Sequence, residues 1–191
     1  MGKIKMKKWK KACIIVIICI LVIGLGSLGG MMYVTSAQSV EHSSNEIVLP
    51  SDENGKTALV IYQPGRSEFA KNISDSIAKG LNDSGYEVTI DYPGEYLPTD
   101  IGQYDIVAFG TTAYYGEFSP ILGNYMSEIK NIDNSTLLIY STGMIKDNFT
   151  ELEGLNKLLH READYLEKFI SNEEESEIKR AYTLGSELGN F

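Results

Sequence analysis

Cysteine and histidine are scarce in this chain of 191 residues, which has two of each. Both cysteines, Cys13 and Cys19, lie in an apolar N-terminal stretch, so the rest of the chain has no disulfide, no thiolate nucleophile and no cysteine metal site. Two histidines are too few for a histidine-rich metal centre. Beyond residue 34 the chain also lacks the Gly-x-Ser-x-Gly elbow, the Walker loop and the Gly-x-Gly-x-x-Gly motif. Their absence argues against the hydrolase and nucleotide-binding classes that these motifs identify.

Basic residues are also few outside one segment. The chain has 17 basic and 26 acidic residues and a net charge of −9. Six of the basic residues are lysines within residues 1–11. Without this segment, 11 basic and 26 acidic residues remain, which gives a net charge of −15. Such an acidic surface disfavours binding to nucleic acid, which needs basic groups against its phosphates. It would attract a basic partner.

The stretch 12–34 carries no charged residue. Its length matches the ~20 residues that a helix needs to cross a ~30 Å hydrocarbon core, so we expect an uncleaved transmembrane helix here. A buried helix of a soluble domain is one alternative, but it leaves the neighbouring lysines unexplained. A cleaved signal peptide is another, with Thr35-Ser36-Ala37 as the cleavage site, although its apolar region is usually only ~7–15 residues long. Neither cysteine lies in the small-residue pattern of a lipidation box.

The charges on the two flanks of this helix predict its orientation. Lysines precede the helix, and the acidic residues Glu41, Glu46, Asp52 and Glu53 follow it. The positive-inside rule therefore places the N-terminus inside and the remaining domain outside the cell membrane. Gly26–Gly30 has the small-residue spacing at which membrane helices pair, so a homodimer through this helix is an additional hypothesis.

Residues 35–56 are rich in Ser, Glu, Asn and Asp and are typical of a tether. Four short apolar or alternating runs follow and are expected to form strands, at residues 58–62, 86–92, 106–109 and 136–140. A buried helical stripe between the first two runs consists of Phe69, Ile73, Ile77 and Leu81. A second helix is expected between Phe118 and Ile129, starting at Ser119-Pro120. This alternation predicts an α/β fold with a parallel sheet and right-handed crossovers.

Three strand ends carry a candidate site. The turn Gln63–Ser67 leads into the first helix, where backbone N–H groups and the helix dipole suit a phosphate. Tyr114 and Tyr115 follow the third strand and offer a flat, polarizable wall. Ser141-Thr142-Gly143 follows the fourth strand. The ordinary alternatives are a strand-to-helix turn that Ser67 caps, and two tyrosines at the surface.

With these pieces in this order, residues 57–144 resemble the flavodoxin-like domains, which bind FMN and move electrons. The resemblance implies the strand order 2-1-3-4, with the switch point between the first and third strands and helices on both faces of the sheet. It implies that FMN is held by Gln63, Gly65, Arg66, Ser67, Thr111, Thr112, Tyr114, Tyr115, Gly116, Ser141, Thr142 and Gly143. The family's Thr-Gly-x-Thr phosphate pattern is only partly met, because Pro64 has no N–H to donate. In the aromatic loop, Thr112 stands where the family usually has proline.

Residues 144–191 depart from the family, because they contain no strand-like apolar run. Leucines between Leu152 and Leu166, together with Ile170, predict one helix, and Ile178 to Leu188 predict another. We therefore expect a domain over residues 57–191 that lacks the family's fifth strand and has a divergent helical C-terminus. Two functions stay open. One is a membrane-anchored FMN protein for electron transfer or flavin-dependent reduction. Outside the cell its redox partner would be a membrane quinone or another surface carrier. The other is a flavodoxin fold without cofactor that serves as an interaction or sensory domain.

Overall fold

The computed structural model describes residues 8–51 and 55–190. Residues 1–7 of the basic segment and Asp52 and Glu53 of the acidic flank lie outside the described residues. The chain divides into two compact units, the first ending at Ser36 and the second starting at Ala37. The first unit contains helix α1 (Lys8–Thr35). By length and hydropathy, Cys13–Ser39 qualifies as a membrane span, a test that a signal sequence near the N-terminus also passes. The expected helix is confirmed, and its insertion into a membrane stays a prediction.

The second unit is built on one sheet of six strands. The strands are β1 (Ile47–Leu49), β2 (Thr57–Tyr62), β3 (Glu87–Asp91), β4 (Ile106–Thr112), β5 (Thr136–Gly143) and β6 (Tyr165–Ile170). They lie in the order β1-β3-β2-β4-β5-β6. All neighbours are parallel except β1, which runs antiparallel to β3. The order expected for the four predicted strands is therefore confirmed.

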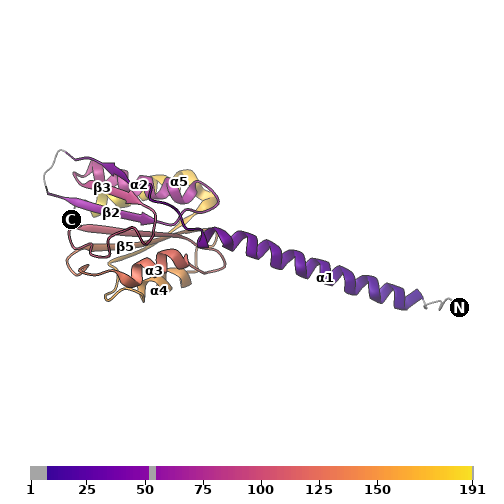
Figure 1. The fold of residues 1–191 in the computed structure, drawn as a ribbon. Helices are drawn as coiled ribbons and strands as arrows, with labels where there is room; N and C mark the ends of the chain where they lie inside the picture. Colours follow the sequence, from indigo (N-terminus) through magenta and orange to yellow (C-terminus); the bar gives the residue numbers. More distant parts are fainter. Residues whose placement is uncertain (1–7, 52–54, 191) are drawn as a thin grey trace. The chain divides into compact units, whose positions relative to one another are not determined.

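Helices cover both faces of the sheet (Figure 1). They are α2 (Phe69–Asp83), α3 (Pro120–Glu128), α4 (Thr150–Asn156) and α5 (Glu174–Leu188), with short 3₁₀ turns at Ser36–Ser39 and Ser171–Glu173. Helices α2 and α5 lie on one face, and α3 and α4 on the other. Helix α3 begins as the sequence predicts, because the Ser119 side chain accepts a hydrogen bond from the backbone of Leu122 and Pro120 follows it.

The prediction that the fifth strand is missing is wrong. Strand β6 pairs in parallel with β5, with Leu138 opposite Tyr165. The single helix expected from Leu152 to Ile170 does not form. Leu152 and Leu155 lie in α4, whereas Leu166 and Ile170 belong to the strand. Glu167 and Lys168 interrupt the apolar pattern of β6, which is why it was not apparent as a strand. The sheet tolerates Lys168 because its ammonium group pairs with the buried carboxylate of Glu151.

Residues 35–56 also differ from the expected tether. Residues 47–49 form β1 on the edge of the sheet, and Ala37 already belongs to the second unit. We call residues 37–45 the entry segment, since they connect the first unit to the sheet. Ser44 Oγ and the backbone N–H of Asn45 both donate hydrogen bonds to the buried carboxylate of Asp91, at 2.7 and 2.8 Å. The entry segment is thus hydrogen-bonded to the end of β3.

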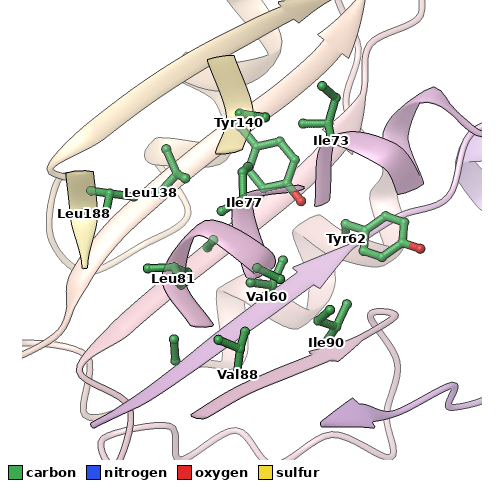
Figure 2. Packing of buried hydrophobic residues seen from close by; sticks show 14 of the residues in the cluster. Val60, Tyr62, Ile73, Ile77, Leu81, Val88, Ile90, Leu138, Tyr140 and Leu188 are labelled. Carbon is green, nitrogen blue, oxygen red and sulfur yellow. The ribbon is translucent and has the colours of Figure 1, made fainter. Parts of the chain in front are cut away.

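Two apolar layers hold the sheet between its helices. One side packs Val60, Tyr62 and Tyr140 against Ile73 and Ile77 of α2 (Figure 2). The Tyr140 hydroxyl lies 2.7 Å from Ser74 Oγ inside this layer, which satisfies a polar group that burial would otherwise penalise. On the other side, Leu59 and Phe109 of the sheet belong to one apolar cluster with Leu122 of α3 and Leu152 of α4.

Helices α2 and α5 approach closely at two glycines. A Cβ atom added at Gly80 would collide with the backbone carbonyl of Tyr182, and one at Gly185 with that of Ile77. Because the obstacle is backbone in both cases, the helices would have to move apart to admit a methyl group. The glycines therefore set the separation of the two helices on this face.

The substitution Gly185→Ala should destabilise the domain by about 1–3 kcal/mol, the usual cost of overpacking a core. Thermal unfolding followed by circular dichroism would measure this as a lower midpoint. Thr183→Ala, on the exposed side of the same helix, is the matched control and should leave the midpoint nearly unchanged. An unchanged midpoint for Gly185→Ala would contradict the close helix contact.

Candidate functional site at the carboxyl edge of the sheet

The turn after β2 leads directly into helix α2. Helix geometry leaves the first N–H groups of α2 without acceptors inside the helix. The N-cap residue is Glu68, whose side chain makes no capping hydrogen bond. Ser67 is therefore not the cap, which corrects the sequence prediction. Arg66 and Ser67 are exposed at this point. The positive end of a 15-residue helix thus opens onto the carboxyl edge of the sheet.

The rest of this turn packs against the end of β4. A Cβ atom added at Gly65 would lie 2.7 Å from Thr112 Oγ1, so only glycine allows the backbone to come this close. The backbone N–H of Arg66 donates to the Tyr114 hydroxyl at 3.3 Å. The structure therefore brings together Gly65, Arg66, Thr112 and Tyr114, as the sequence predicts.

The loop after β4 is a tight reversal with an exposed aromatic tip. Tyr114 and Glu117 exchange backbone hydrogen bonds, and Tyr115 and Gly116 between them have φ values of 56° and 80°. Two central residues with positive φ are the mark of a type I′ turn. Tyr115 is 65% exposed. A bulky residue in the left-handed region stores strain of about 1–3 kcal/mol, and such positions cluster at functional sites.

The residues Ser141, Thr142 and Gly143, which the sequence places after the fourth strand, form the last part of β5. The hydroxyl groups of Ser141 and Thr142 do not face the surface, although the sequence analysis expected them to contact a ligand. Ser141 is fully buried and donates to Glu151 Oε1 at 2.7 Å. Thr142 is also buried and donates to Thr112 Oγ1 at 3.3 Å. Gly143 lies beside Ala113 in the neighbouring loop. The end of β5 is therefore part of the interior of the protein.

The entry segment covers the space between the ends of β2 and β4. The side-chain amide of Gln38 donates to the backbone carbonyls of Thr112 and Glu117, both at 2.7 Å. Its own backbone carbonyl accepts a hydrogen bond from Ser119 Oγ at 2.7 Å. The backbone N–H of Ser119 in turn donates to Thr111 Oγ1. Residue 38 is consequently buried on the edge of the sheet.

Gln63 faces the same segment from the β2 side. Its Nε2 donates to the carbonyl of Val40 at 3.0 Å and to that of Ala37 at 3.4 Å. Its Oε1 is buried and has no hydrogen-bond partner among the residues that the structure describes. Gln63 therefore binds the chain itself, and one acceptor in this region is still unsatisfied.

A buried ion pair lies between α4 and β6. The ammonium group of Lys168 contacts Glu151 Oε1 and the backbone carbonyl of Asn148, and both side chains are almost inaccessible. Glu151 Oε1 also accepts from Ser141, whereas Oε2 has no partner in the described part of the chain. Because Ser141 belongs to β5, the ion pair and this hydrogen bond together link α4, β5 and β6.

Three tyrosines have raised pKa values: Tyr62 at the end of β2, Tyr96 in the loop after β3, and Tyr140 in β5. Burial, with a hydrogen bond to Tyr92, raises the pKa of Tyr62, and burial raises the pKa of Tyr140. Burial and the nearby Asp91 raise the pKa of Tyr96 to about 12. All three phenols are therefore neutral at pH 7 and act as hydrogen-bonding groups rather than as bases.

One cavity of about 350 Å³ lies beside the end of β3. Its lining includes Glu41, His42, Tyr96, Tyr125 and Glu128. None of the twelve residues predicted to contact a cofactor lines this cavity. It is therefore separate from the edge formed by β2, β4 and β5.

Comparisons with known proteins give similarity in structure but not in sequence. No family model matches the chain, and no curated protein matches it. A Streptococcus pneumonia TIGR4 flavodoxin is 19% identical, with a TM-score of 0.59 over 70% of this chain and 98% of that one. The Megasphaera elsdenii flavodoxin is 12% identical, with a TM-score of 0.58 over 70% and 99%. The fold is flavodoxin-like.

A third similar structure is an NADH:FMN oxidoreductase, 15% identical with a TM-score of 0.53 over 71% of this chain and 89% of that one. At these identities the likeness establishes the fold alone. In this flavodoxin-like fold the ends of β2, β4 and β5 form one edge, as the sequence resemblance implied. The contacts of each predicted site residue with a ligand stay a prediction.

Sequence reasoning missed Gln38, Glu151 and Lys168. Gln38 lies in a polar stretch whose composition is typical of a tether, and no local pattern distinguishes it from its neighbours. Lys168 and Glu151 are 17 residues apart, and only the pairing of β6 with β5 brings them together. The one available signal was the fifth strand that the family resemblance implied.

The substitution Lys168→Ala should destabilise the domain by about 3–5 kcal/mol, because it leaves the carboxylate of Glu151 buried without a partner. The double substitution Lys168→Met with Glu151→Met should recover most of this loss, since neither charge is then buried. Thermal unfolding would compare the variants. Lys179→Ala, which removes a fully exposed ion pair with Glu175, is the control and should leave the midpoint unchanged. Equal losses in the single and double variants would contradict this account.

Proposed function

We propose that this chain is a membrane-anchored, flavodoxin-fold protein that holds FMN non-covalently for electron transfer or flavin-dependent reduction. The observation that carries the proposal is the uncapped N-terminus of α2 beside two tyrosines at the same edge of the sheet. Flavin supplies one- and two-electron chemistry when bound, and the protein supplies binding and electrostatics.

The end of α2 fits the phosphate of FMN. Free N–H groups and the helix dipole favour an anion there, and Ser67 offers an exposed hydroxyl. Because Gly65 has no side chain, the backbone of the turn packs directly against Thr112. The carboxylate of Glu68 at the N-cap would repel the negatively charged phosphate. We therefore expect the positive charge of the exposed Arg66 to offset this repulsion.

Tyr114 and Tyr115 fit the flavin ring. Tyr115 is exposed at the tip of the turn, where its aromatic face is available for stacking. The polar groups of Gln63, Ser141 and Thr142 are engaged within the protein, so we leave them out of the proposed contacts. The acidic domain would disfavour the anionic reduced flavin and lower its reduction potential.

FMN should bind more tightly than riboflavin to the purified protein, because only FMN has a phosphate for the α2 N-terminus. Tyr115→Ala should weaken FMN binding by about 0.5–1.5 kcal/mol, roughly twofold to tenfold. Flavin fluorescence titration measures both effects. Tyr182→Ala, a partly exposed tyrosine on α5, is the matched control. Equal affinity for FMN and riboflavin would rule out the phosphate site, and no binding of either would end the FMN proposal.

The apolar helix α1 and the lysines before it support a single-pass anchor in the cell membrane with the domain outside. Protease added to intact cells should then digest the domain while a cytosolic marker stays intact. If a known surface protein is digested while the domain is not, the domain lies inside the cell. A membrane quinone or a surface redox protein is the partner that we propose for an outward domain, and pairing through α1 is a further hypothesis for its assembly.

One observation favours a second function, a domain without cofactor that binds other proteins or senses a signal. Gln38 occupies the carbonyls of Thr112 and Glu117, and Gln63 binds the entry segment, so the protein's own chain uses part of the edge. In this case the folded protein would bind neither FMN nor riboflavin. The flavin titration therefore decides between the two functions.

A further inference from the structure

Four large apolar side chains are exposed on two loops at the carboxyl edge. Tyr115 follows β4, whereas Met144, Ile145 and Phe149 follow β5, and they are 65%, 71%, 62% and 42% exposed. We call these four residues the edge patch. The loops lie side by side, because Ala113 N donates to Thr142 O and a Cβ at Gly116 would lie 3.2 Å from Asn148 Nδ2. Exposed large apolar side chains gathered on adjoining loops are typical of an interaction surface.

The chain enters the domain on the same loop that carries Tyr115. Gln38 is hydrogen-bonded to Thr112, Glu117 and Ser119, so the second residue of this unit is fixed at the carboxyl edge. Thr35 is the last residue of α1. A residue spans at most ~3.6 Å, so Gln38 lies within about 11 Å of chain from Thr35. Only two residues, Ser36 and Ala37, therefore separate α1 from the residue that is fixed at the carboxyl edge.

We propose that the edge patch docks on the membrane, with Met144, Ile145 and Phe149 in the interface and Tyr115 at the level of the headgroups. This inference rests on the membrane anchor proposed above and does not require FMN. Tyrosine is enriched at membrane interfaces, and apolar side chains of peripheral segments insert ~5–10 Å into the headgroup and acyl boundary.

Apolar contact rather than charge drives this docking. The two loops hold Lys146 beside the acidic Asp147 and Glu117, so they have no basic excess that would attract anionic lipid. A short covalent link raises the effective concentration of the edge at the membrane, so even a weak apolar contact is populated.

Tryptophan fluorescence in vesicles tests the proposal on the full chain. The substitution Trp9→Phe removes the single native tryptophan. One new tryptophan is then introduced by Ile145→Trp. Asp133→Trp, exposed before the start of β5 at the opposite edge, is the matched control. Both proteins are reconstituted in phosphatidylcholine vesicles, with and without lipids brominated near the headgroup end of their acyl chains.

Emission from position 145 should be shifted to the blue and strongly quenched by the brominated lipid, whereas emission from position 133 should match that in water. Equal and weak quenching at both positions would overturn the docking proposal. Flotation of the same vesicles separates this failure from that of the anchor. Protein that floats without quenching overturns only the docking, whereas protein that does not float overturns the anchor and the docking with it. Adding FMN should leave the quenching at position 145 in place.

Discussion

The side-chain amide of Gln38 holds together the part of the molecule that matters for function. Its two hydrogen bonds to the carbonyls of Thr112 and Glu117 shape the loop after β4, and Ser119 binds its backbone in return. Hydrogen bonds of this kind contribute about 0.5–1.5 kcal/mol each to the free energy of unfolding. The entry segment is therefore part of the carboxyl edge, and the loop that bears Tyr115 depends on it.

The sequence predicted the parts of the fold that depend on local pattern. The buried stripe of α2, the Ser119-Pro120 start of α3 and four of the parallel strands are all visible as spacing or turn residues. It did not predict β6, because Glu167 and Lys168 interrupt the apolar run and the burial of Lys168 depends on Glu151, a residue 17 positions earlier. The hydrogen bonds between residues 37–45 and the sheet could not be predicted either, because a short polar segment has no pattern that shows which groups it will bind.

The candidate site could likewise be predicted only in part. Glycine and aromatic residues next to strand ends could be identified from order alone, and Gly65, Arg66, Thr112 and Tyr114 do lie together. The direction in which a hydroxyl points depends on packing, so burial of Ser141 and Thr142 could not be foreseen. A site reduced to the α2 N-terminus and the two tyrosines is open on its outer side. If that side also rests on a membrane, a lipid-soluble redox partner suits it better than a nucleotide in solution.

The docked state of Gln38 is the central claim, and nuclear magnetic resonance of its side-chain amide tests it directly. In the full chain in detergent, without flavin, both amide protons of Gln38 should exchange slowly with water and show contacts to the loop after β4. Mutation to Gln38→Ala would identify the signals by their loss. Rapid exchange, with the chemical shifts of a free glutamine, would show an undocked segment and contradict the account of the carboxyl edge.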